Sequence, residues 1–186
     1  SLCFPSQFGC TQDVPTYDYN PAKAKKLLAE AGYPNGFETP FLAYRNRDYA
    51  EAMINNLNAV GIKAKLEYLK YAAFRDKVQS GGAPFNFGTW GSYSINDVSA
   101  ITSHFQSGGK DDYSKDPEVI KQLGIGDTSV DAGVRKAAYK AALSRISGEA
   151  FMFPLWSYNT WYAFSKDVDF NPTPDEIPRF FTAKWK

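Results

Sequence analysis

The spacing of hydrophobic positions changes between two periods along the first half of the chain. Apolar residues recur at helical spacing over 21–31 and 48–60, whereas residues 62–68 alternate between apolar and charged side chains. Short apolar runs at 39–44 and 85–90 read as further strands. Because strands alternate with helices here, the pattern predicts an α/β fold with a parallel core sheet flanked by helices.

Capping residues predict where further helices begin. Asn20-Pro21 and Asp116-Pro117 combine an N-cap side chain with a proline suited to the first helical turn. Gly32 ends the first of these helices, and the second is expected to reach about residue 123. The remaining helices are expected over 71–79, over 96–104 and from 131 to about 148. The last and longest helix has an inward stripe formed by Ala138, Tyr139, Ala142, Leu143, Ile146 and Ala150.

The C-terminal part of the chain predicts less regular structure. Residues 151–158 and 161–165 are rich in aromatic side chains and read as two strands hinged at Asn159-Thr160. Residues 170–186 contain three prolines and four aromatic residues, which do not make a self-contained element. We expect this tail to pack against something outside the chain.

Charge and hydropathy exclude several classes of partner. The formal net charge is +1, whereas nucleic acids and anionic membranes are bound through concentrated basic patches, so we expect no nucleic acid partner. No apolar run approaches the roughly 20 residues of a membrane span. Aromatic residues reach 16% of the chain, which favours a wall for a ligand or a partner domain, with an aromatic core as the alternative.

The chain has two cysteines, Cys3 and Cys10, which are close in sequence. A local disulfide in an oxidising compartment is the preferred interpretation, and two reduced cysteines in a loop are the alternative. Two cysteines and the lone His104 are too few for a structural zinc site. We therefore expect no metal and no cofactor.

Candidate catalytic groups are sparse. A hydrolytic triad needs a base beside its nucleophile, and the single histidine has no serine in a nucleophile-elbow sequence near it. Asp111 and Asp112 are adjacent, which favours a solvated acidic loop over a weak calcium site. The pattern predicts a binding protein rather than an enzyme.

Ligands of open α/β sheets bind just beyond the carboxyl ends of the strands. The residues that the pattern places at this edge suit stacking and hydrogen bonding; they include Tyr44, Arg45, Tyr68, Trp90, Ser92 and Tyr93. Arg45 is suited to pairing with a ligand carboxylate, and the alternative is a solvated loop arginine.

Four stretches of the chain resemble one family. They are residues 19–33, 57–64, 71–74 followed by Trp90-Gly91, and the final long helix followed by 153–156. In order and spacing they are similar to the C-terminal part of family 5 extracellular solute-binding proteins, which serve peptide- and nickel-type ABC importers.

The resemblance implies one lobe of a two-lobed periplasmic clamshell. Residues 1–165 would form the second lobe, and residues 166–186 would cross back to a first lobe that lies outside this chain. The implied partners are a peptide or similar small solute and an ABC permease in the inner membrane. The tail's aromatic residues also suggest a dimer of the isolated chain.

The resemblance also implies site residues. Peptide binders of the family commonly carry an aspartate three residues after the tryptophan of this segment, and Tyr93 stands there instead. Asp97 lies close enough in sequence to substitute. Trp90 matches the family's tryptophan and would form part of the cleft wall, with a core tryptophan as the alternative. Ser92 is a ligand-binding candidate by its position alone. Tyr158 and Asn159, at the expected turn after a strand, are further ligand-binding candidates.

Two other functions remain open at this point. Similar modules serve as ligand-sensing domains of transcription regulators, although the cysteine pair argues against a cytoplasmic sensor. A sugar-acting hydrolase is disfavoured because no carboxylate pair stands out at the sheet edge.

Overall fold

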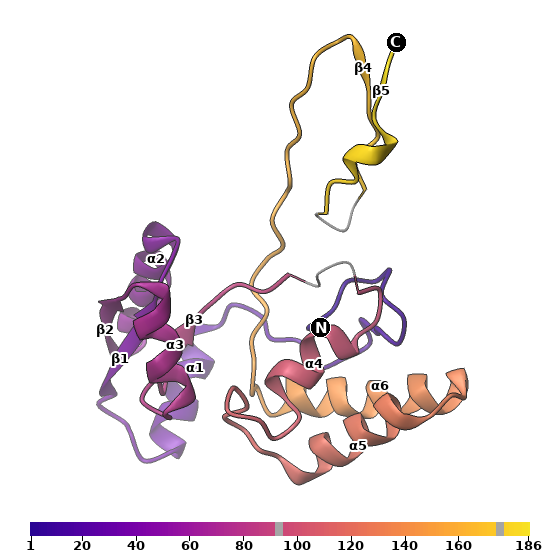
Figure 1. Ribbon diagram of the computed structural model, residues 1–186. Helices are drawn as coiled ribbons and strands as arrows, with labels where there is room; N and C mark the ends of the chain where they lie inside the picture. Colours follow the sequence, from indigo (N-terminus) through magenta and orange to yellow (C-terminus); the bar gives the residue numbers. More distant parts are fainter. Residues whose placement is uncertain (92–94, 174–176) are drawn as a thin grey trace. The chain divides into compact units, whose positions relative to one another are not determined.

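The computed structural model describes residues 1–91, 95–173 and 177–186 (Figure 1). The chain divides into two compact units. One consists of residues 16–89, and the other combines residues 1–15 with residues 90–186.

The unit formed by residues 16–89 is built on a parallel sheet. Strands β1 (Phe37–Ala43), β2 (Ile62–Tyr68) and β3 (Asn86–Phe87) lie in the order β2-β1-β3. β1 pairs with β2 along its whole length and with β3 at its carboxyl end. The predicted α/β architecture with a parallel core is confirmed.

Helices cover both faces of this sheet (Figure 1). α2 (Arg47–Ala59) buries Ala50 and Ile54 against Phe41 and Ala43, whereas α3 (Tyr71–Gln79) packs on the face that carries Leu42. β1 is therefore buried on both faces, which explains the consecutive apolar residues at its end. The predicted bounds of α3 match those of the structure.

Helix α1 (Pro21–Glu30) begins at the predicted cap. The Asn20 side chain accepts a hydrogen bond from the backbone N–H of Lys23 at 2.9 Å, and Pro21 occupies the first turn. None of the α1 residues is buried, and Leu27 is 52% exposed. The cap and the proline thus set where this helix begins.

The unit formed by residues 1–15 and 90–186 has a helical core. It contains α4 (Ser99–Phe105), α5 (Pro117–Thr128) and α6 (Ala132–Gly148), with α5 and α6 lying side by side (Figure 1). Asp116 and Asp131 cap α5 and α6 as predicted. The core residues are Leu2, Val98, Val119, Leu123, Tyr139, Ala142, Leu143 and Ile146.

Several predicted boundaries are wrong. α5 continues through Gly124 and Gly126 to Thr128, because the bare backbone of Gly126 faces the ring of Tyr139. The third strand covers two residues rather than 85–90, α4 begins at Ser99 rather than at 96, and Ala150 lies beyond α6 and is exposed.

The two strands predicted over 151–158 and 161–165 are absent: these residues form neither helix nor strand. A strand is defined by a ladder of backbone hydrogen bonds to a neighbouring strand, and none of the described residues pairs with this segment in that way. Its aromatic pattern therefore favours extended backbone without specifying a partner.

The tail contains more structure than predicted. β4 (Val168–Asp169) pairs antiparallel with β5 (Lys184–Trp185), and a short 3₁₀ helix, η1 (Phe180–Thr182), precedes β5. Phe170 stacks on Phe180 with ring centroids 5.8 Å apart. Within the described ranges, no helix is long and apolar enough to cross a membrane.

Candidate ligand-binding site

Tyr44 lies at the carboxyl end of β1, where the sequence placed it. Its ring packs against Tyr71 and Phe74 of α3, with centroid distances of 5.0 and 4.8 Å. Its hydroxyl shares a hydrogen bond with Oγ1 of Thr89 at 3.1 Å. Aromatic packing against α3 and the bond to Thr89 therefore fix the direction of the Tyr44 hydroxyl.

Arg45 extends this cluster to the surface. Its Nη1 donates to Thr89 Oγ1 at 3.0 Å, and its guanidinium carbon lies 5.2 Å from the centroid of the Tyr44 ring. The side chain is exposed and forms no ion pair with any carboxylate of the described residues. Arg47, by contrast, is paired with Glu51 at 2.8 Å.

The Tyr44–Arg45–Thr89 cluster thus presents a cation whose position is fixed by an aromatic ring and a hydroxyl. A guanidinium held in this way retains free N–H groups in a planar fork, the geometry that matches a carboxylate. Thr89 and Tyr71 are site residues that the sequence reasoning missed. The position of Thr89 two residues beyond β3 was the available signal.

Trp90 belongs to the other compact unit, so it does not end the third strand as predicted. Its ring stacks on His104 at 4.2 Å, with an interplanar angle of 21°, and meets Phe105 edge to face at 5.1 Å. The Trp90 side chain is half-buried, so it contributes to the packing of α4. His104 Nε2 in turn lies 3.5 Å from Asp111 Oδ2.

Asp97 has protein partners for both carboxylate oxygens. Oδ2 pairs with Nη2 of Arg135 at 2.7 Å, and Oδ1 accepts from the backbone N–H of Ser99 at 3.0 Å. The hydrogen bonds of Arg135 to Tyr139 and Asp97 raise the pKa of its guanidinium. A ligand ammonium that bound Asp97 would have to share the negative charge of its carboxylate with Arg135. Ser92 and Tyr93 lie outside the described residues, and their roles stay predictions.

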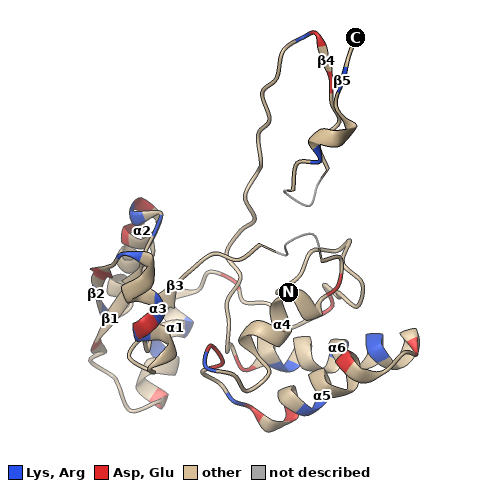
Figure 2. Ribbon diagram, viewed as in Figure 1, with Lys and Arg blue, Asp and Glu red and all other residues tan. Residues whose placement is uncertain are grey.

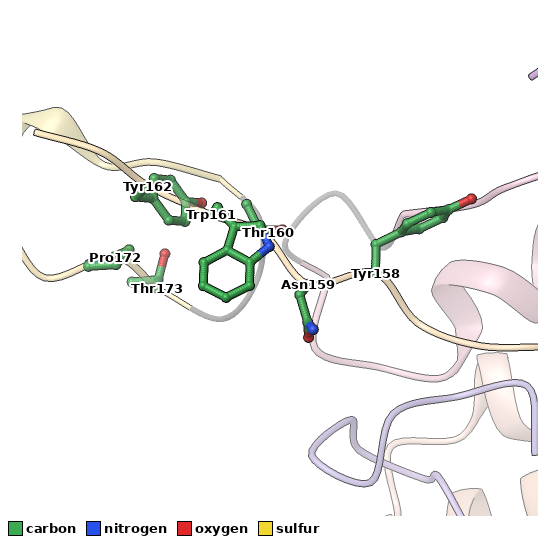
Figure 3. Close-up of a pocket in the computed structure, with 7 residues that line it drawn as sticks. All are labelled: Tyr158, Asn159, Thr160, Trp161, Tyr162, Pro172 and Thr173. Carbon is green, nitrogen blue, oxygen red and sulfur yellow. The ribbon is translucent and has the colours of Figure 1, made fainter. Parts of the chain in front are cut away.

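Tyr158 and Asn159 line a hollow of about 540 Å³ in the C-terminal segment (Figure 3). The other lining residues are Thr160, Trp161, Tyr162, Pro172 and Thr173. In the view of Figure 3, Trp161 lies toward Pro172 and Thr173, whereas Tyr158 points away from them. The Tyr162 hydroxyl is buried without a hydrogen-bond partner among the described residues, so the hollow holds one unused polar group.

The acidic loop is organised by hydrogen bonds within the protein. Asp112 is buried, and its carboxylate accepts from the backbone N–H groups of Gly108 and Lys115 and from the Ser114 hydroxyl. Across the ranges that the structure describes, no group of three or more histidine, cysteine or carboxylate side chains could hold a metal ion. The Asp112 carboxylate therefore serves the loop itself.

Charge is distributed unevenly along the chain. Residues 151–165 carry no charged side chain, and this stretch is uniformly tan in Figure 2. Phe153, Trp156, Tyr158 and Trp161 of this stretch are nevertheless exposed, Trp161 to 88%. An uncharged segment with exposed aromatic side chains is typical of a surface that another protein surface covers.

The chain matches the model of the bacterial extracellular solute-binding proteins, family 5 Middle, over residues 1–112. This is more than half of its length, and the chain therefore belongs to that family. Heme-binding protein A of Haemophilus influenzae is 34% identical over 85 residues, which are 41% of this chain and 16% of that protein. The glutathione-binding protein GsiB of Escherichia coli is 38% identical over 66 residues, or 33% of this chain and 13% of that protein.

The fold is that of one lobe of a periplasmic binding protein. The dipeptide-binding protein of Pseudoalteromonas sp. SM9913, solved in complex with Met-Leu, superposes with a TM-score of 0.80 at 24% identity. The superposition covers 100% of this chain and 39% of that one. The chain thus spans well under half the length of the relatives that it matches.

Proposed function

We propose that this member of family 5 is part of the substrate-binding component of an ABC importer and captures a small solute that carries a carboxylate. The observation that carries the proposal is the Tyr44–Arg45–Thr89 cluster, in which an exposed guanidinium without a carboxylate partner among the described residues stands at the end of a parallel strand. This is the edge of an open α/β sheet at which ligands bind.

The names of the relatives support a carboxylate ligand. They are called heme-binding, glutathione-binding and dipeptide-binding proteins. These ligands differ in size and polarity, but heme, glutathione and dipeptides all carry free carboxylates. A fixed arginine recognises this shared group, while the remaining surface discriminates among the rest of each molecule.

The proposed mechanism is capture without chemistry. The solute binds between two lobes, which close by hinge bending and complete its hydrogen bonds from both sides. The closed protein then delivers the solute to a permease in the inner membrane. The binding protein itself would therefore lie in the periplasm. The disulfide between Cys3 and Cys10 fits an oxidising compartment.

The proposal also assigns the parts of the chain to the two lobes. Residues 1–165 provide the second lobe and its half of the cleft, and residues 166–186 return to the first lobe. The uncharged and exposed stretch 151–165 supports this assignment, because its aromatic side chains are left for another surface to cover. We expect the chain alone to bind weakly, since it offers half of the contacts.

The function is tested by titrating the purified protein with heme, glutathione and the dipeptide Met-Leu in a calorimeter. Arg45→Met should weaken binding of the carboxylate ligand by roughly 10- to 100-fold, the range of a hydrogen bond to a charged group. Arg47→Met is the matched control, because Arg47 is also exposed but is paired with Glu51. It should leave the affinity unchanged.

A second comparison isolates the carboxylate. If Met-Leu binds, its C-terminal amide should bind the wild-type protein as weakly as Met-Leu binds Arg45→Met, and the variant should not distinguish acid from amide. Equal affinity of the wild-type protein for acid and amide would contradict the assigned role of Arg45. No binding of any of the three solutes by the folded protein would contradict the proposed ligand class.

A further inference from the structure

Tyr71 lies at the edge of the sheet at which ligands of open α/β folds bind. β2 ends at Tyr68, and the backbone N–H of the next residue, Leu69, donates to the carbonyl of Ala43 at the end of β1, at 2.9 Å. α3 therefore starts beside the carboxyl ends of β1 and β2. Tyr71 is the first residue of α3, and helical side chains lean toward the amino end of their helix, so this side chain leans toward the ligand edge.

Tyr44 connects the Tyr71 ring to the exposed cation of the Tyr44–Arg45–Thr89 cluster. The ring centroids of Tyr44 and Tyr71 are 5.0 Å apart, with an interplanar angle of 57°. The guanidinium carbon of Arg45 lies 5.2 Å from the centroid of the same Tyr44 ring. A peptide extends by about 3.5 Å per residue. A ligand whose terminal carboxylate binds Arg45 therefore brings its last side chain within reach of Tyr71.

The Tyr71 ring has surface available for a ligand. The residue is 60% exposed, and its ring contact within the described part of the chain is with Tyr44. Its neighbours at this edge offer less. Phe74 is buried, Tyr44 is half-buried, and the guanidinium of Arg47 lies over the ring of Tyr68 at 5.6 Å. Tyr71 thus places an open aromatic ring close to a fixed cation.

We propose that Tyr71 is a specificity-determining residue of this site and that the solute carries an aromatic side chain next to the carboxylate bound by Arg45. An aromatic ring that packs on Tyr71 removes apolar area from water and gains the offset or edge-to-face contact that aromatic pairs prefer. An aliphatic side chain gains the burial alone, and glycine gains neither. This inference rests on the proposed function, because it takes Arg45 as the anchor of the carboxylate.

Calorimetric titration with the dipeptides Met-Phe, Met-Leu and Met-Gly tests the inference. The three probes share the amino end, the peptide bond and the free carboxylate, and they differ in the last side chain. The wild-type protein should bind Met-Phe roughly 2- to 10-fold more tightly than Met-Leu, the value of an aromatic pair, and Met-Gly more weakly than both.

The outcomes separate this inference from the proposed function. Equal affinity for Met-Phe and Met-Leu, with binding still weakened by Arg45→Met, would overturn the inference and leave the carboxylate site standing. Failure of the folded protein to bind any of the three dipeptides would overturn both.

Variants of Tyr71 assign the preference to its ring. Tyr71→Phe keeps the ring and should keep the preference for Met-Phe over Met-Leu, whereas Tyr71→Ser should abolish it. Tyr33→Ser is the matched control. Tyr33 is 50% exposed and packs on the ring of Phe37 at 5.1 Å, at the amino end of β1, which is the opposite edge of the sheet. This control should leave the order of affinities unchanged. A wild-type preference in Tyr71→Ser would overturn the role of Tyr71.

Met-Gly separates direct contact from an effect through Arg45. Because Met-Gly has no side chain to place on the ring, Tyr71→Ser should leave its affinity unchanged, which also shows that the variant folds. Arg45→Met should weaken all three dipeptides by the same factor, because they share the carboxylate. Equal weakening of all three by Tyr71→Ser would show that the ring acts by holding Tyr44 and Arg45, and would overturn the proposed contact.

Discussion

Arg145 of α6 and Asp116 at the N-terminus of α5 form a two-point ion pair. Nε of Arg145 lies 2.8 Å from Oδ1 of Asp116, and Nη2 lies 2.7 Å from Oδ2. Oδ1 also accepts from the backbone N–H groups of Glu118 and Val119, so one carboxylate both caps α5 and joins it to α6. This pair connects residues that are 29 positions apart.

The ion pair predicts a stability change in acid. The hydrogen bonds from Arg145 and from the α5 backbone lower the pKa of Asp116 from 3.8 to about 2. A carboxylate with a lowered folded-state pKa stabilises the protein above the unfolded value, and this contribution is lost as the pH falls from about 4 to 2. In thermal unfolding, the melting temperatures of wild type and Asp116→Asn should therefore differ by several degrees at pH 6 and converge near pH 2.

Asp131→Asn is the control for this measurement. Asp131 caps α6 through the N–H of Val134 but forms no ion pair with the described residues. Because asparagine is an equally good cap, this variant should remain close to wild type at pH 6. A pH-independent difference between wild type and Asp116→Asn would contradict the assignment.

Two glycines in α5 should respond in opposite directions to substitution by alanine. A Cβ on Gly126 would lie 2.5 Å from Cε1 of Tyr139, whereas a Cβ on Gly124 meets nothing within 4 Å. Gly126→Ala should lower the free energy of unfolding by about 1–3 kcal/mol through overpacking. Gly124→Ala should raise it by about 0.5–1 kcal/mol because alanine is the better helix former. Equal effects in urea unfolding would show that Tyr139 moves aside.

The hydroxyl of Tyr139 predicts a second pH effect. It donates to Asp127 Oδ1 at 2.8 Å and accepts from Arg135 Nη2 at 3.0 Å, and burial raises its pKa from 10.0 to about 12. Its contribution is therefore complete below pH 10 and declines as the pH rises toward 12. Tyr139→Phe should cost about 1–3 kcal/mol at pH 7, and should lack this decline in unfolding measurements between pH 9 and 12. A variant as stable as wild type would contradict the role of this network.

The exposed aromatic surface predicts self-association of the chain by itself. Trp161, Phe181 and Trp185 are 88%, 85% and 81% exposed. Replacing all three with serine should shift the chain from dimer to monomer in sedimentation velocity at tens of micromolar. Leu27→Ser, which removes an exposed apolar side chain from α1, should leave the distribution unchanged. A monomeric wild-type chain would contradict the predicted dimer.

The candidate site was predictable in part. The strand end at Tyr44 and Arg45 follows from the hydrophobic pattern, because a parallel strand exposes its carboxyl-end residues at the ligand edge. The environment of Arg45 does not follow from the pattern, since it depends on Thr89, 44 positions later. Asp97 shows the same limit: its sequence neighbourhood suggested a ligand contact, whereas the fold pairs it with Arg135.

The sequence by itself determined the structural features that depend on residues close together along the chain. The caps at Asn20, Asp116 and Asp131 and the bounds of α3 are correct, because a capping side chain and a helical stripe act within one or two turns. Tertiary structure alone decided which extended segments became strands. Residues 151–165 have the aromatic composition of strands but pair with no strand among the described residues, whereas the two residues of β3 pair with β1. A strand requires hydrogen bonds from a remote segment, and no local pattern supplies them.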